Sequence, residues 1–383
     1  SSIRRIDARS DRIATVAGGG GIGRAGDGAS ASSAEFDHIA AMCFDGAGNL
    51  YVADGKNNRI RRIAAGTGIV TTVATGGSPG VFGPFPNTGE PTAGMTLEFV
   101  RDMVADAAGD LFVADQWHHR VRKVETRTGR ITTIAGSGAI DFKTGGFSGD
   151  GGPATAARLN SPSGLAMDGR GNLFIADAGN HRIRMVDAAT GIISTVVGSG
   201  PGGVASGAFS GDAGLAAAAR LSFPEGLAIA SDGSLYIADS INDRIRRVDA
   251  RTAVITTVAG TGASGRAAPV SGDGGPATSA RLDHPSAVAF DVDGNLLVVE
   301  EGSGRIRKIA LGSGVITTRA GREKSGLSGA GFSGGGGFCP FGPPRRAPPP
   351  MRCCMRFFMS STALVNFSCC SGVRSALISP VYF

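Results

Sequence analysis

Short hydrophobic runs alternate with turns rich in glycine and aspartate along most of the 383-residue chain. Within residues 164–197, four such runs of four to six residues follow one another. They are rich in β-branched or aromatic side chains and bounded by Gly, Asp or Asn, which indicates β-strands rather than helices. The turn from Asp168 to Asn172 contains Asp-Gly and Gly-Asn pairs, which tolerate positive φ in a hairpin. The pattern predicts a meander of four antiparallel strands.

This four-run unit occurs five times. An acidic residue after the second run marks its register, with steps of 61, 62, 62 and 61 residues. These residues are Asp54, Asp115, Asp177, Asp239 and Glu300. A fixed period indicates a repeat architecture, and four-stranded meanders repeated radially are the blades of a β-propeller; a solenoid is the competing interpretation. Residues 1–18 match the second half of a unit, so we predict an all-β propeller of five full four-stranded blades plus an N-terminal half blade.

The recurring strings include Gly-Leu-Ala, Asp-x-x-Gly-Asn-Leu-(Phe/Tyr)-(Ile/Val)-Ala-Asp, Asn-His-Arg-Ile-Arg and Thr-Gly-x-Ile-x-Thr-Val. They resemble NHL repeats, in the long form of bacterial and teneurin-like proteins, over residues 1–330. The resemblance implies a propeller of six blades when the ring is closed. The extra length precedes each first strand and reads Gly-Phe-Ser-Gly-Asp-Gly-Gly-Pro-Ala at residues 146–154, where Pro153 predicts the start of a short helix.

Residues 331–383 depart from this pattern. They carry five arginines and no Asp, Glu or Lys, and they hold five of the six cysteines. Nothing in them matches the first two strands of a unit, although a closed ring needs two strands from this end to pair with residues 1–18. We therefore expect a Gly/Pro/Cys/Phe-rich tail that is disordered or translated out of frame, which leaves closure with a sixth blade open.

Charge and cysteine usage narrow the function classes. The net charge of +6 includes +5 from residues 331–383, which leaves 6 − 5 = +1 for residues 1–330. That region lacks the basic excess of a dedicated nucleic-acid binder, and its single Cys43 provides neither a disulfide framework nor metal-ligand spacing. No apolar run reaches the 18 residues of a membrane span. The compartment stays undefined, and only the resemblance favours an extracellular or surface-associated protein.

Residues that recur in every unit have two interpretations. The acidic residues after the second run could form a ring of carboxylates that binds a cation in a channel. Alternatively, each holds the following turn and pairs with an arginine of the third strand, whose stem packs between blades. Repetition favours the structural role, since a catalytic residue is needed once. The arginines, each followed two residues later by a second one, are Arg59, Arg120, Arg182, Arg244 and Arg305. Another recurring set, for which we expect a turn or helix-capping role, is Asp27, Asp150, Asp212 and Asp273.

Positions that differ between units are better candidates for binding. One register, just before the first strand, contains His38, Phe99, Phe223 and His284. Another, between the second and third strands, contains Trp117, His118 and His119. Both connections of a four-stranded meander emerge on one face, and variable loops on a rigid scaffold are frequent binding sites. Trp117 is the only tryptophan, a residue enriched in interface hot spots, or else a hydrophobic cap on the Asp115 turn.

No catalytic signature is present. A metal site of His38, His118 and His284 is conceivable, but no acidic residue stands beside them at diagnostic spacing, so we predict no metal and no cofactor. The favoured function is a non-catalytic, monomeric propeller that binds a protein or glycan partner through the variable face. A metal-dependent enzyme of the lactonase or lyase type is the alternative. RNA binding, which some NHL domains perform, is a further alternative that the near-neutral charge disfavours.

Overall fold

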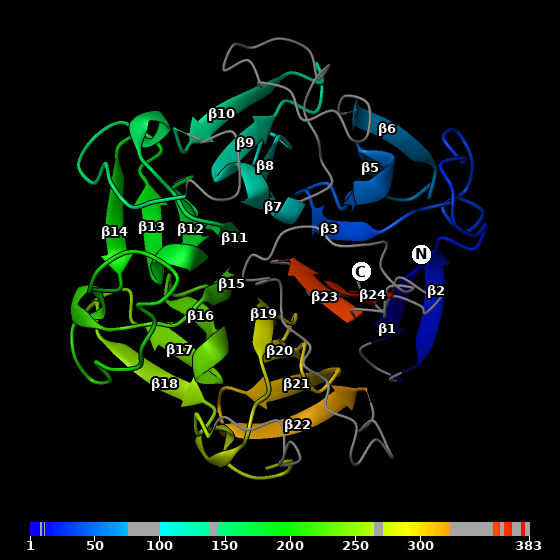
Figure 1. Ribbon diagram of the computed structural model, residues 1–383. Coiled ribbons are helices and arrows are strands. Elements are labelled where there is room, and N and C mark those ends of the chain that lie inside the picture. The colour runs from blue at the N-terminus through cyan, green and yellow to red at the C-terminus, as the bar shows by residue number, and fades with distance from the viewer. Residues whose placement is uncertain are drawn as a thin grey trace, which may run out of the picture.

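The computed structural model describes residues 1–7, 10, 12–75, 100–137, 145–263 and 271–321, together with the backbone of three strands between residues 355 and 379. Five four-stranded antiparallel sheets, here called blades 1 to 5, are arranged around a central axis (Figure 1). The first strand of each blade lies next to the first strand of the following blade, around the axis. The predicted all-β propeller is confirmed, and each full sequence repeat forms one four-stranded blade.

The strands follow the predicted order within each blade. Blade 1 contains β3 (Ile39–Phe44), β4 (Leu50–Asp54), β5 (Arg59–Ile63) and β6 (Val70–Thr75). Blade 2 contains β7 (Val100–Ala105), β8 (Leu111–Asp115), β9 (Arg120–Val124) and β10 (Ile131–Ala135). Blade 3 contains β11 (Pro162–Met167), β12 (Leu173–Asp177), β13 (Arg182–Val186) and β14 (Ile193–Val197). Blade 4 contains β15 (Pro224–Ile229), β16 (Leu235–Asp239), β17 (Arg244–Val248) and β18 (Ile255–Ala259). Blade 5 contains β19 (Pro285–Phe290), β20 (Leu296–Glu300), β21 (Arg305–Ala310) and β22 (Val315–Ala320).

The remaining position in the ring holds the N-terminal half blade, β1 (Ile3–Asp7) and β2 (Ile13–Ala17). Strand β23 (Met355–Ser360) lies between β19 and β3 and pairs with β24 (Leu364–Cys369) (Figure 1). Strand β25 (Leu377–Ser379) pairs in parallel with β1, unlike the antiparallel pairs of the five full blades. Most of residues 331–383 lies outside the described part of the chain, so a separate tail with that boundary stays a prediction.

The hydrophobic core lies between neighbouring blades. Ala114 and Val121 of blade 2 pack with Leu165 and Ile175 of blade 3, and equivalent clusters join the other blades. Both faces of a blade are therefore buried against neighbours, which explains why the second strands read as continuous apolar runs. No described helix is long and apolar enough to cross a membrane.

The long insert before a blade closes the outer rim between two blades. The backbone N–H of Gly136, after β10, donates to the carbonyl of Ala154, and the N–H of Ala154 donates to the carbonyl of Gly191, before β14; both distances are 2.9 Å. The short helix expected after Pro153 is a single 3₁₀ turn, Ala154–Ala156. Equivalent turns are Ala216–Ala218 and Ala277–Ser279. Since this turn bonds to the outermost strands, the insert also covers sheet edges that would otherwise be exposed.

Candidate functional site

The repeated aspartate holds together the two connections on one face of each blade. Asp177 is fully buried and accepts hydrogen bonds from the backbone N–H of Asn160 (2.6 Å) and the side chain of Asn180 (2.8 Å). Asp239 makes the same bonds in blade 4. Burial raises the pKa of Asp177 to about 6, against the effect of these hydrogen bonds and of Arg184. Each carboxylate is therefore occupied within its own blade.

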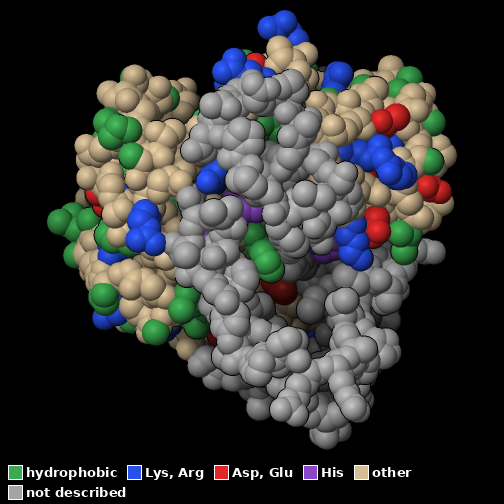
Figure 2. All heavy atoms as spheres, turned by 45° about the horizontal axis from the view of Figure 1, so that its top comes forward, with side chains coloured by type: hydrophobic (Ala, Val, Ile, Leu, Met, Phe, Trp, Pro, Cys, Tyr) green, Lys and Arg blue, Asp and Glu red, His purple; other side chains and the backbone are tan. Residues whose placement is uncertain are grey.

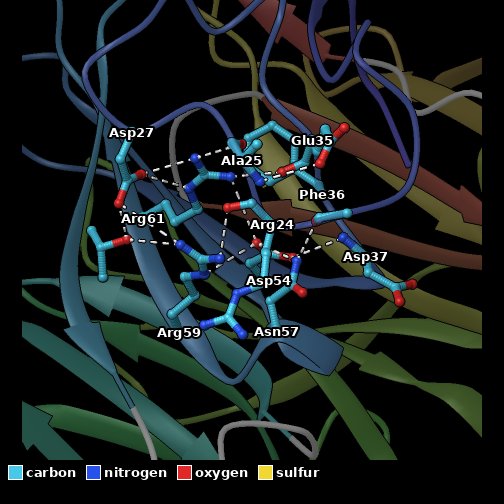
Figure 3. A network of polar contacts seen from close by, with 12 residues as sticks. Arg24, Ala25, Asp27, Glu35, Phe36, Asp37, Asp54, Asn57, Arg59 and Arg61 are labelled. Carbon is cyan, nitrogen blue, oxygen red and sulfur yellow. Dashed lines mark hydrogen bonds and ion pairs between the residues drawn. The ribbon is translucent and has the colours of Figure 1, made fainter.

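The second arginine of each pair is the more deeply buried one. Arg184 is fully buried between Asp177 (3.5 Å) and Asp150 of the insert (2.6 Å). Figure 3 shows the blade 1 example, in which Arg61 lies 2.8 Å from Asp27 and 3.7 Å from Asp54. The same pair of a buried arginine and an insert aspartate is formed by Arg246 with Asp212 in blade 4 and by Arg307 with Asp273 in blade 5.

The first arginine of the pair has a different environment. The guanidinium of Arg182 lies 4.0 Å from the ring centroid of Phe147, and that of Arg244 lies 3.7 Å from Phe209. Both rings come from inserts, so the inserts before blades 3 and 4 each contribute an aromatic ring as well as an aspartate. Spacing alone could not distinguish the two arginines, since both recur at the same interval.

The insert aspartates do not cap the short helices, contrary to one sequence-based expectation. Asp150 accepts a hydrogen bond from the hydroxyl of Thr195 (2.6 Å) while it pairs with Arg184. The following 3₁₀ turn has no side-chain cap. The aspartate instead lies beside the buried guanidinium, because that charge requires a counter-charge once it is removed from water.

Trp117, His118 and His119 have three different environments. His118 is buried, and its Nδ1 lies 2.6 Å from Oδ1 of Asp115, in the place that Asn180 occupies in blade 3. His119 is also buried, and its Nδ1 accepts a hydrogen bond from the backbone N–H of Ser161 in the next blade (2.8 Å). Trp117 is 38% exposed. Of these three side chains, the indole alone has a substantial surface toward solvent.

The other variable register lies at the blade junctions. Phe223 and His284 have φ values of 48° and 51°, and each donates its backbone N–H to a side chain of the preceding blade. The acceptors are His181 Nδ1 (3.0 Å) and Asp243 Oδ1 (2.8 Å). His38 has the same left-handed backbone, and its N–H donates to the hydroxyl of Ser1. Phe99 lies outside the described residues.

A charged group near the axis was missed at the sequence level. Nη2 of Arg101 in blade 2 lies 2.6 Å from Oε2 of Glu225 in blade 4 and 3.8 Å from Oε2 of Glu301. Asp102 accepts hydrogen bonds from the N–H groups of Met103 and Leu165, both at 2.8 Å, and burial raises its pKa to about 7. The register of Arg101 holds Ala or Ser in blades 1, 3 and 5 and Glu225 in blade 4, while the register of Asp102 holds Ala or Gly in the other blades. Charged residues at positions where most first strands have small residues were the sequence signal that could have revealed this group.

The cavity beside this group is small. It has a volume of about 30 Å³ and is lined by the first strands of blades 2 to 5, including Arg101, Asp102, Ser163 and Glu225. This volume accommodates one or two water molecules, whereas small-molecule sites measure roughly 300–1,000 Å³. This cavity is therefore too small for an organic substrate.

Exposed side chains mark the tips of the turns between second and third strands. Trp117 and the 45%-exposed Ile241 occupy the same position in blades 2 and 4, and Lys56 occupies it in blade 1. In the coloured part of Figure 2, basic side chains are more prominent than acidic ones, and both are scattered among hydrophobic side chains. Among the described residues, one group of potential metal ligands is present, Asp243, Asp283 and His284; it includes neither His38 nor His118.

The fold and the aspartate–arginine contacts that recur from blade to blade define the class of protein, a β-propeller built from sequence repeats. A family model of the teneurin NHL domain matches residues 86–187 and 130–208. NHL repeat-containing protein 2 of Bos taurus is 28% identical over 277 residues, which cover 66% of this chain and 36% of that protein. Teneurin-1 of Mus musculus is 39% identical over 98 residues, which cover 24% of this chain and 4% of that protein. These matches support an NHL-repeat β-propeller family for this chain.

Solved structures agree with the fold. A nutrient binding protein from Bacteroides ovatus is similar with a TM-score of 0.53 and 16% identity, over 83% of this chain and 64% of that chain. At this identity the similarity concerns the fold alone. The chain spans about a third of the length of NHL repeat-containing protein 2 and a small part of teneurin-1.

Proposed function

We propose that this propeller is a non-catalytic, monomeric binding domain that recognises a protein partner through the face carrying the inserts and the turns between second and third strands. The observation that carries the proposal is the position of Trp117. Its indole is 38% exposed at the tip of a turn, although both histidines that follow it are buried. Exposed tryptophan is enriched among residues that dominate binding energy in protein interfaces.

The turn beneath Trp117 is held on both sides. His118 bonds to Asp115 in the same blade, and His119 bonds to Ser161 in the next. A side chain presented by such a rigid turn loses little conformational entropy on binding, which favours affinity. Ile241 provides a second exposed apolar side chain at the equivalent tip in blade 4, two blades further around the ring.

The alternatives have less support. A lactonase- or lyase-type enzyme needs a substrate cavity, and the axial cavity of about 30 Å³ accommodates only water. RNA binding needs a basic surface, and residues 1–330 carry a net charge of 6 − 5 = +1.

The test compares Trp117→Ala with Val292→Ala. Val292 is 61% exposed in a turn between first and second strands, which emerges on the opposite face, so it is a matched control. Partners are identified by proximity labelling with the wild-type chain, and each is purified and titrated by biolayer interferometry. We expect Trp117→Ala to weaken binding at least roughly tenfold, with a melting temperature within a few degrees of wild type, and Val292→Ala to bind normally.

Two results would contradict the proposal. Unchanged binding by Trp117→Ala, together with a large loss of stability, would assign the indole a structural capping role. Binding to a random RNA pool that weakens steeply with salt would favour the RNA-binding alternative. A glycan array examined with the same two variants distinguishes a glycan partner from a protein partner.

A further inference from the structure

Three potential metal ligands meet at the junction between blades 4 and 5. Asp243 follows the 3₁₀ turn Ser240–Asn242 of blade 4, while Asp283 and His284 directly precede β19 of blade 5. One ligand atom from each lies within 4.8 Å of the others. Asp243 is buried, whereas Asp283 and His284 are partly exposed, so an ion has access from solvent.

The equivalent junctions show which of these residues the fold requires. Each needs an acceptor for the backbone N–H before the first strand, and His119, His181 and Asp243 all fulfil this role. In blade 3, Ser161 donates this N–H and Asn160 precedes it. In blade 4, Phe223 donates it and Ser222 precedes it. Neither pair contains a carboxylate or an imidazole, whereas blade 1 carries Asp37 and His38 at these positions. The acceptor for the His38 N–H is the hydroxyl of Ser1, where the junction of blades 4 and 5 has the Asp243 carboxylate. The inter-blade hydrogen bond therefore does not need Asp283 and His284, and among the described residues only the junction of blades 4 and 5 brings such a pair together with a third potential ligand.

The local charges favour a cation. A carboxylate oxygen of Asp243 and one of Asp283 lie within 4.8 Å of each other at this junction. Two carboxylates held this close repel each other when both are ionised, and a bound cation removes that repulsion.

We propose that Asp243, Asp283 and His284 bind one divalent transition-metal ion, with Zn²⁺ as the preferred ion, and that the ion links blade 4 to blade 5. Imidazole together with carboxylate is a donor set for zinc, whereas Ca²⁺ and Mg²⁺ are bound by oxygen alone. The hydrogen bond from the His284 N–H already fixes the Asp243 carboxylate at the junction. Three protein ligands leave a fourth tetrahedral position for water.

The experiment titrates the full chain with ZnCl₂ by isothermal calorimetry after treatment with EDTA and dialysis. The cysteines are alkylated first, because five of the six lie in residues 331–383 and their thiolates bind zinc. The variants are Asp243→Asn, Asp283→Asn and His284→Asn. Asparagine occupies the Asp243 register in blade 1 as Asn58, with the same left-handed backbone, so Asp243→Asn keeps the fold and an acceptor. Asn160→Ala, at the Asp283 register of blade 3, is the matched control.

We expect one Zn²⁺ per wild-type chain, a rise in melting temperature on binding, and an affinity loss of at least roughly tenfold in each of the three variants. Asn160→Ala should bind zinc like the wild type. Absence of zinc binding, or equal binding by all three variants, overturns the proposal. Equal affinity for CaCl₂ combined with no effect of His284→Asn also overturns it, because the imidazole would then not be a ligand.

Discussion

The Nδ1 atom of His181 in blade 3 accepts a hydrogen bond from the backbone N–H of Phe223 in blade 4, at 3.0 Å. The ring of Phe223 also lies edge-on to the imidazole, with the centroids 4.8 Å apart. Nε2 of His181 faces the carbonyl of Gly203 at 3.1 Å. A neutral imidazole with its proton on Nε2 satisfies both contacts, so this junction depends on the protonation state of one histidine.

Acid should weaken the junction between blades 3 and 4. Burial lowers the pKa of His181 below its ordinary value of 6.5, so the folded protein favours the neutral ring. The stability that His181 contributes is therefore fully present above pH 6.5 and is lost as the pH falls through the lower folded value. We expect His181→Asn, which keeps an acceptor as Asn58 does in blade 1, to lose less stability than wild type between pH 7 and pH 5. Urea unfolding at each pH measures the difference; parallel profiles for the two proteins would contradict the assignment.

Sequence periodicity predicted the blades because the repeat fixes both the strand order and the register of the buried aspartates. It could not predict the fate of variable residues. His118 varies in sequence yet is buried, because an imidazole and the amide of Asn180 can occupy the same hydrogen-bonding position beside an aspartate. Variation along the chain therefore did not imply exposure. Arg101 and Glu225 are 124 residues apart, and only the arrangement of the blades around the axis brings them together.

The two arginines of one pair should differ in their contribution to stability. Arg184→Met leaves Asp177 buried without its guanidinium, and breaking a buried ion pair costs about 3–5 kcal/mol. Arg182→Met removes a contact with the half-exposed ring of Phe147 and hydrogen bonds to the carbonyls of Gly198 and Gly200, and should cost about 1–2 kcal/mol. Urea denaturation of both variants gives the free energies of unfolding. Equal losses would show that the ion pair with Asp177 does not distinguish the second arginine from the first.

The ion pair between Arg101 and Glu225 should couple blade 2 energetically to blade 4. Its side chains are 16% and 23% exposed, and the 2.6 Å contact is made near the axis, where burial strengthens the attraction. A double-mutant cycle with Arg101→Ala and Glu225→Ala should give a coupling free energy of about 1–3 kcal/mol. The control cycle uses Arg247 and Asp232, 3.2 Å apart on the surface with 28% and 57% exposure, for which less than about 1 kcal/mol is expected. Both cycles are measured as free energies of unfolding in urea at two salt concentrations. A coupling for Arg101 and Glu225 that is no larger than the surface control, or equally reduced by salt, would show that the axial pair does not link the blades.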